Sequence, residues 1–185
     1  MALVEVERPG AGAVVVLTLN RPERLNAWRT AMGAELFTLL HAHDVDDRTR
    51  VIVVTGRGRA FCAGADLEPT GDTFARERAW EETRRLEQPI LRWNMRTPVI
   101  AAFNGPAVGI GATLPLWWDF RFAAASARIG FVFARRGIAP EAGSTWFLPR
   151  LVGMATALDL MLTGRLVGAD EALRLGLVHR VIPDE

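Results

Sequence analysis

Two stretches of the sequence place small residues directly after an apolar run, where backbone N–H groups could bind an anionic oxygen. In the first, residues 51–56 (VIVVTG) are followed by residues 59–67 (RAFCAGADL), and the second is residues 99–111 (VIAAFNGPAVGIG). Small residues let a ligand approach the backbone, and free N–H groups at a helix start favour developing negative charge. Two such turns facing each other would form an oxyanion hole from main chain alone. The same glycines could equally serve only to end strands tightly.

One acidic residue, Glu141, stands in a turn of small residues (GIAPEAGST, 137–145) where it could act as a general acid or base. Its alternative role is structural, because a carboxylate at a helix N-terminus is stabilised by the helix dipole. An apolar pocket would raise its pKa towards neutrality. The aromatic candidates for the lining of such a pocket are Trp117, Phe133, Trp146 and Phe147.

Other kinds of chemistry have little support. The chain has no lysine and no tyrosine, which excludes a Schiff-base lysine, a P-loop lysine or a catalytic tyrosine. The single cysteine, Cys62, has no histidine motif beside it and is expected to be a buried, inert thiol. His41 and His43 lie two apart on a predicted helix and His179 is isolated, so no metal site is predicted.

The composition describes a folded domain that binds neither nucleic acid nor membrane. Half of the 185 residues are hydrophobic, 23% are charged, and the net charge is +1, so there is no basic excess for nucleic acid. The longest apolar run, residues 98–118, is interrupted by glycines and prolines and does not read as a membrane span. One cysteine and an acidic start without a signal-like pattern favour a soluble protein of the cytoplasm.

The elements that must position these turns alternate between strands and helices, which predicts an α/β fold with parallel strands in a single domain, 1–185. β-Branched and apolar runs predict the strands, and residues 50–55 have the pattern of a strand buried on both faces. The predicted strands are 14–19, 50–55, 99–103, 120–125, 128–133 and 177–182. The predicted helices are 26–43, 72–94, 109–118 and a tail over 145–175 that breaks at Gly153 and Gly164.

Together with residues 19–27 (LNRPERLNA), the two glycine-rich segments resemble the crotonase (enoyl-CoA hydratase/isomerase) superfamily. The likeness continues to residues 177–183 (LVHRVIP). It implies a crotonase-like fold of repeated ββα units, with a core over about 1–150 and the start of a helical C-terminal region at about 151–185. Family chains continue further, so this helical region looks truncated and apolar surface is expected to be exposed near residue 185. With that region present, the family forms homo-oligomers, as trimers or dimers of trimers.

The resemblance also implies roles for individual residues. The N–H groups of Ala65 and Ile110 would bind the thioester oxygen of an acyl-CoA, which enters as the substrate, so no separate cofactor and no metal are implied. Arg24 would meet the CoA phosphates and Asp66 would lie near the adenine. The full set of implied CoA-binding residues is Arg24, Ala63, Ala65, Asp66, Leu67 and Ile110.

The family's chemistry depends on its acids. The two glutamates of family hydratases correspond to Thr113 and Phe133, which cannot act as general acid or base. Glu141 occupies the position of the single catalytic glutamate in delta-3,delta-2-enoyl-CoA isomerases. The expected activity is therefore double-bond isomerisation in fatty acid metabolism through an enolate held by Ala65 and Ile110. Hydration of enoyl-CoA, hydrolysis or dehalogenation of a CoA thioester at the same site, and a non-catalytic acyl-CoA-binding role remain as alternatives.

Overall fold

The computed structural model describes residues 2–66 and 94–184, and its largest element is a six-stranded sheet. The strand order is β1-β2-β3-β4-β6-β9, with β1 antiparallel to β2 and each later pair parallel. The predicted parallel α/β arrangement is thus confirmed. The strands are β1 (Val4–Glu7), β2 (Val14–Leu19), β3 (Val51–Gly56), β4 (Val99–Phe103), β6 (Phe120–Ala124) and β9 (Arg180–Ile182).

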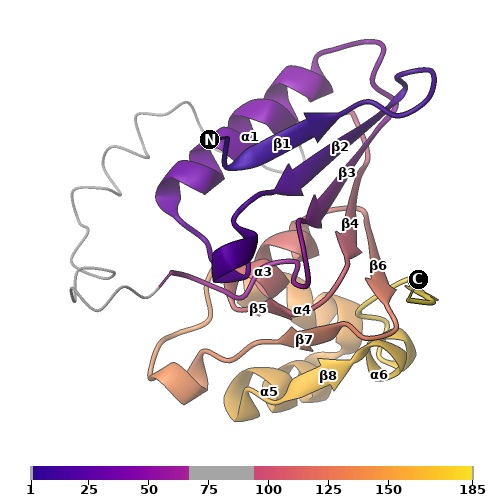
Figure 1. The fold of residues 1–185 in the computed structure, drawn as a ribbon. Coiled ribbons are helices and arrows are strands. Elements are labelled where there is room, and N and C mark those ends of the chain that lie inside the picture. The colour runs from indigo at the N-terminus through magenta and orange to yellow at the C-terminus, as the bar shows by residue number, and fades with distance from the viewer. Residues whose placement is uncertain (1, 67–93, 185) are drawn as a thin grey trace.

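A smaller sheet and most of the helices make up the C-terminal part of the fold (Figure 1). In the picture α1 lies along the N-terminal strands, whereas α4, α5 and α6 gather around the small sheet. That sheet has the order β5-β7-β8, formed by β5 (Ala107–Val108), β7 (Arg128–Gly130) and β8 (Leu166–Gly168). The α-helices are α1 (Thr30–Asp44), α3 (Ile110–Thr113), α4 (Ser144–Val152), α5 (Met154–Thr163) and α6 (Ala169–Arg174). Short 3-10 helices are η1 (Pro22–Arg24), η3 (Leu114–Trp117) and η4 (Ala134–Arg136).

The first helix begins later than the sequence predicts. The prediction started it near Asn26, whereas α1 starts at Thr30. Leu25 and Asn26 have φ angles of 52° and 54°, which lie in the left-handed region and are incompatible with a right-handed helix. Trp28 then pairs with Ala65 as an isolated parallel bridge. The four residues before α1 therefore connect this loop to the segment around Ala65.

The second part of the chain also departs from its predicted elements in detail. The helix predicted over 109–118 divides into α3 and η3, because Pro115 cannot donate the N–H that a continuous α-helix needs there. The strand predicted over 128–133 stops at Gly130. The helical tail breaks at Gly153 and Gly164 as predicted, with φ angles of +80° and +61°, but β8 lies between α5 and α6. The short edge strand β1 was not among the predicted strands.

One hydrophobic core joins the two parts. In β3, Ile52 and Val54 are fully buried while Val51 and Val53 are half-buried, so only one face of this strand is fully covered. Phe61 and Phe103 meet edge to face with their ring centroids 4.9 Å apart. Within the described residues, no helix is long and apolar enough to cross a membrane. The helix predicted over 72–94 falls almost entirely outside the described residues.

Apolar side chains are exposed on α5, while the expectation of exposed apolar surface near residue 185 stays a prediction. Met154, Leu158 and Leu162 recur every four residues and are 63%, 48% and 70% exposed. This spacing places them on one face of the helix. Ala157, Leu160 and Met161 of the same helix are buried in the core.

Candidate active site

The two glycine-rich turns meet at the carboxyl ends of β3 and β4. The N–H of Val108 donates to the carbonyl of Cys62 at 2.9 Å. A Cβ atom added at Gly111 would lie 2.4 Å from that carbonyl oxygen, and one added at Gly109 would lie 3.5 Å from the Cα of Gly64. Gly64 and Gly109 also have φ angles of +98° and +56°, which favour glycine. The glycines are therefore required for two backbones to pack directly against each other.

The backbone around Ala65 leaves one N–H group free. Trp28 donates its N–H to the carbonyl of Gly64 at 2.8 Å and accepts from the N–H of Asp66 at 2.9 Å. Because peptide groups in extended chain alternate in direction, the N–H of Ala65 points away from Trp28. Within residues 2–66 and 94–184 it donates no hydrogen bond. The N–H of Ala65, the predicted first oxyanion donor, is thus unpaired, while the hydrogen bonds of Gly64 and Asp66 to Trp28 fix the backbone on both sides of it.

The N–H of Ile110 is unpaired in the same sense. Gly109 donates to the carbonyl of Gly130 at 2.9 Å, and the carbonyl of Gly109 accepts from Thr113 at 3.0 Å, whereas Ile110 opens α3 and finds no acceptor within the described part of the chain. The first N–H groups of a helix have no intrahelical partner. Each of the two free donors directly follows one of the glycines that meet between the turns. The structure therefore brings the two predicted oxyanion donors to one place.

Glu141 is connected to this place through Thr113. The hydroxyl of Thr113 donates to Oε1 of Glu141 at 2.6 Å, and Thr113 itself is fully buried. Thr113 lies one turn after Ile110 on α3, so a single helix carries both the second predicted oxyanion donor and the partner of the carboxylate. Burial raises the pKa of Glu141, and the hydrogen bond from Thr113 opposes the rise without cancelling it. Glu141 as a whole residue keeps contact with solvent, which is the condition for proton exchange.

The turn that carries Glu141 is held in an uncommon conformation. Ala142 has a φ of +50°, and Gly143 follows with +63°. The indole of Trp117 donates to the carbonyl of Ala142 at 2.5 Å, and Ser144 donates its N–H to the carbonyl of Glu141 at 3.0 Å. A non-glycine residue at positive φ persists where the surroundings determine it, and such positions are common at functional sites. The carboxylate is therefore fixed by its own turn as well as by Thr113.

The aromatic residues expected around Glu141 do not all take that place. Phe133 is 4% exposed, and Trp117 packs against Phe147 with ring centroids 6.3 Å apart. Trp146, in contrast, is 60% exposed, and the guanidinium of Arg150 lies over its ring at 3.3 Å. Trp146 is therefore a surface side chain in a cation–π pair rather than part of an enclosed lining.

Asp66 is surrounded by arginines. Its carboxylate accepts from Arg21 and Arg29 at 2.9 Å each and from Arg24 at 3.4 Å. Burial alone would raise the pKa of Asp66, but the three guanidinium groups hold it below its usual value. Arg24 and Arg29 are about half exposed, at 55% and 47%, so the cluster presents positive charge to solvent. Such a cluster suits an anionic group such as a phosphate, while a contact of Asp66 with adenine stays a prediction.

Asn26 supports this region from beneath. It is fully buried; its Oδ1 accepts from the N–H of Arg21 at 2.8 Å, and its Nδ2 donates to the carbonyls of Arg57 and Ala60. The sequence analysis missed the roles of Asn26, Arg21 and Arg29, although an asparagine before a predicted helix is a recognised signal for left-handed backbone. Ala63 is tied to the same loop, because its N–H donates to the carbonyl of Leu25 at 3.0 Å. Leu67 lies outside the described residues.

The remaining polar candidates play no part in this arrangement. Cys62 is fully buried as predicted, and burial raises the pKa of its thiol to about 11, against a hydrogen bond with Gly64, which favours the protonated form; its inertness stays a prediction. Within residues 2–66 and 94–184, no group of three or more His, Cys, Asp or Glu side chains could hold a metal ion.

Comparison with known proteins places this geometry in a family. Residues 10–185 match the family model described as enoyl-CoA hydratase/isomerase. A probable enoyl-CoA hydratase of Rhodobacter capsulatus is 45% identical over 92% of this chain and 66% of its own length. A 1,2-epoxyphenylacetyl-CoA isomerase of Escherichia coli is 41% identical over 93% of this chain and 67% of its own length. The chain thus spans about two thirds of these relatives.

The solved structures agree. A probable enoyl-CoA hydratase/isomerase from Mycobacterium abscessus superposes with a TM-score of 0.86 at 40% identity, covering 97% of this chain and 69% of that one. The chain belongs to the enoyl-CoA hydratase/isomerase family and has the crotonase-like α/β fold. The resemblance found in the sequence motifs is therefore confirmed.

Proposed function

We propose that this chain acts on enoyl-CoA thioesters and moves a double bond from C3 to C2, with Glu141 as the single acid and base. The observation that carries the proposal is the 2.6 Å hydrogen bond between Thr113 and Glu141. It connects one carboxylate to the helix that begins with the donor of Ile110. The side chain at the position of the first hydratase glutamate is the threonine itself, which supports the carboxylate but cannot transfer the proton in its place.

The site has the parts that isomerisation requires. The carboxylate of Glu141 takes a proton from C2, and the electron pair of that C–H bond delocalises onto the thioester oxygen as an enolate. The N–H groups of Ala65 and Ile110 donate to this oxygen, and losing one such donor typically costs about 100- to 1000-fold in rate. The enolate then collapses to a C2–C3 double bond while C4 receives the proton from Glu141. No water is consumed, and one carboxyl group serves both transfers.

The electrostatics support the same proposal. A carboxylate that removes a proton from carbon works best when its pKa approaches the working pH, and burial moves the pKa of Glu141 in that direction. Arg24 and Arg29 present positive charge beside Asp66, next to the donor of Ala65, where the phosphates of CoA would bind. The acyl and CoA parts of the substrate would then lie on either side of Ala65.

Hydration is the alternative within the family. One relative is named a probable hydratase and another an isomerase of an aromatic CoA thioester, so the names do not choose between the reactions. A single carboxylate could also direct water to a CoA thioester in hydrolysis. A protein that binds acyl-CoA without turnover would keep the arginines and the donors but would not need the raised pKa of Glu141.

The deciding experiment offers 3-enoyl-CoA and 2-enoyl-CoA side by side to the wild type, Glu141→Gln and the control Glu7→Gln on the exposed face of β1. We expect conversion of 3-enoyl-CoA to 2-enoyl-CoA, a loss of at least about 100-fold in kcat for Glu141→Gln, and no change for Glu7→Gln. Exchange of the C2 proton with deuterated solvent reports the enolate independently of product. An inert 3-enoyl-CoA, or full activity in Glu141→Gln, would refute the proposal. Hydration of 2-enoyl-CoA alone would favour the hydratase, and binding without turnover would favour the binding protein.

A further inference from the structure

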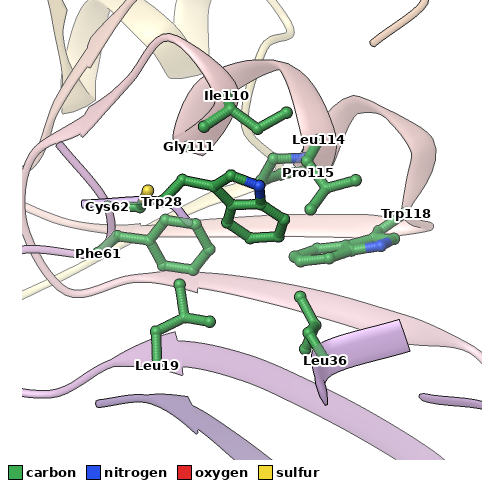
Figure 2. A pocket seen from close by; sticks show the side chains of 10 residues that line it. All are labelled: Leu19, Trp28, Leu36, Phe61, Cys62, Ile110, Gly111, Leu114, Pro115 and Trp118. Carbon is green, nitrogen blue, oxygen red and sulfur yellow. The ribbon is translucent and has the colours of Figure 1, made fainter. Parts of the chain in front are cut away.

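A narrow apolar cavity lies next to the second oxyanion donor, and the indole of Trp28 lies in its middle (Figure 2). In the close-up, Ile110 lies on one side of the indole, Leu19 and Leu36 on the other, and the rings of Phe61 and Trp118 flank it. The lining residues come from both glycine-rich segments, from α1 and from the loop before it. They are Leu19, Trp28, Leu36, Phe61, Cys62, Ile110, Gly111, Leu114, Pro115 and Trp118.

Trp28 and Ile110 differ from the rest of the lining in their exposure. Both are half-buried, whereas Leu19, Leu36 and Phe61 are at most 2% exposed. Trp28 and Ile110 therefore stand between the deep part of the cavity and the open side. The backbone of Trp28 is fixed by its two hydrogen bonds to Gly64 and Asp66, on either side of Ala65, so the indole starts from a fixed point beside the first predicted donor.

Gly33 determines where the indole can lie. A Cβ atom added at Gly33 would come within 2.7 Å of Cζ2 of Trp28, which is closer than carbon atoms approach. Gly33 lies inside α1, where glycine is unfavourable relative to alanine. Its position beneath the indole supplies a packing reason for a residue that the helix alone would not favour. Trp28 and Gly33 thus form a matched pair, one filling the cavity and the other making room for it.

We propose that Trp28, seated on Gly33, limits the length of the acyl group that the site accepts and selects thioesters of short-chain acids. This inference rests on the proposed function, because it assumes that an acyl-CoA binds with its thioester oxygen on Ala65 and Ile110. An acyl chain that extends from this oxygen along Ile110 meets the indole before it reaches the deep apolar part of the cavity. Removing the indole would open that part, whose walls at Leu19, Leu36 and Trp118 are suited to further methylene groups.

The test compares the wild type with Trp28→Phe, Trp28→Leu and Trp28→Ala on a series of straight-chain 3-enoyl-CoA thioesters from six to twelve carbons. Each methylene that gains an apolar site improves kcat/KM by roughly fourfold. We therefore expect Trp28→Ala to shift the preference for ten carbons over six by at least about tenfold. Trp28→Leu should fall between, and Trp28→Phe should keep the wild-type profile. Leu158→Ala, a truncation on the exposed face of α5, is the control that should change nothing.

Gly33→Ala tests the pair without altering the indole itself. It should displace the ring and change the chain-length profile in the wild type, and it should have no further effect in Trp28→Ala, where the added methyl group meets no ring. The single variant Gly33→Ala keeps the inference testable if Trp28→Ala folds poorly.

Calorimetric titration with saturated acyl-CoA thioesters of the same lengths gives a readout that does not need turnover. An unchanged chain-length profile in every Trp28 variant, with activity retained, would overturn the inference and leave the proposed function standing. Equal weakening for all thioesters and for free CoA would assign Trp28 to the carrier part of the ligand and also overturn it. A wild type that neither binds nor converts any thioester would remove the proposed function itself.

Discussion

The hydroxyl of Thr113 donates to the carboxylate of Glu141 at 2.6 Å, across 28 positions of the sequence and between two elements of the fold. Thr113 therefore orients the carboxylate of Glu141 and lowers its pKa against the effect of burial. Thr113 is fully buried, whereas Glu141 contacts solvent, so the hydrogen bond joins the core to the surface of the site. Two consequences can be measured, one on activity and one on stability.

The first prediction concerns the pH profile. Thr113→Val keeps the shape of the side chain but removes the donor, so the ionised form of Glu141 loses a stabilising contact and its pKa rises further. Hydrogen bonds to charged groups contribute about 1.5–3 kcal/mol, and one pKa unit corresponds to about 1.4 kcal/mol. The acid limb of kcat/KM should therefore move to higher pH. Thr113→Ser, which keeps the hydroxyl, should leave the limb in place, and an unmoved limb in Thr113→Val would contradict the assignment.

The second prediction concerns stability in Glu141→Gln. The folded state raises the pKa of Glu141, so the folded protein binds this proton more tightly than the unfolded chain does. Stability is then fully present below the ordinary carboxyl pKa of about 4.3 and declines as pH rises through the shifted value. The amide carries no charge and escapes this loss. Thermal unfolding should give equal Tm values for the two proteins near pH 4 and a higher Tm for Glu141→Gln at pH 8. A Tm that is lower for the variant at pH 8 would contradict the raised pKa.

The third prediction concerns the contact between the two turns. Gly111→Ala places a methyl group 2.4 Å from the carbonyl oxygen of Cys62, so the turns must separate. Overpacking of this kind costs about 1–3 kcal/mol, and the displaced donors should lower kcat by 100-fold or more. Gly168→Ala is the matched control, because the nearest atom to its added methyl group is 3.8 Å away and its φ is ordinary. Chemical denaturation and kcat measured on both variants should separate them clearly, whereas similar values would mean that the turns tolerate separation.

The residue types allowed the prediction of features that depend on short-range backbone conformation, such as the two glycine-rich turns, whereas the choice of Ala65 and Ile110 as donors came from the family resemblance and stays a prediction. The donors at Ala65 and Ile110 follow glycines whose φ is positive, a property that the residue types already favour. The position of Glu141 in a turn leading into a helix was also predictable, since small residues and a proline precede that helix. The breaks at Gly153 and Gly164 follow from the same local rule.

What sequence alone could not provide depends on contacts between distant segments. The start of α1 shifts to Thr30 because Trp28 pairs with Ala65, 37 residues away along the chain. The three arginines around Asp66 converge only when the loop before α1 folds onto the end of the first turn. The close approach of Gly33 to Trp28 likewise requires the packed ring. Periodicity and propensity carry no information on such pairings, which tertiary packing decides.

The last prediction concerns the charge balance around Asp66. Asp66→Asn keeps the size of the side chain but removes the carboxylate that Arg21, Arg24 and Arg29 share, so the side chain of Arg21, only 9% exposed, loses this charged contact. Because the other two arginines face solvent, we expect a modest loss of about 1 kcal/mol at pH 7, which lowers Tm by roughly 2–4 °C. The folded state lowers the pKa of Asp66, so its contribution is present above the ordinary aspartate pKa of about 3.9 and is lost as pH falls further. The difference in Tm between wild type and Asp66→Asn should therefore shrink as the pH is lowered from 7 towards 3. Asp170→Asn, in the exposed first turn of α6, is the control with an equal change of charge, and an equal effect there would show that net charge rather than the arginine cluster is responsible.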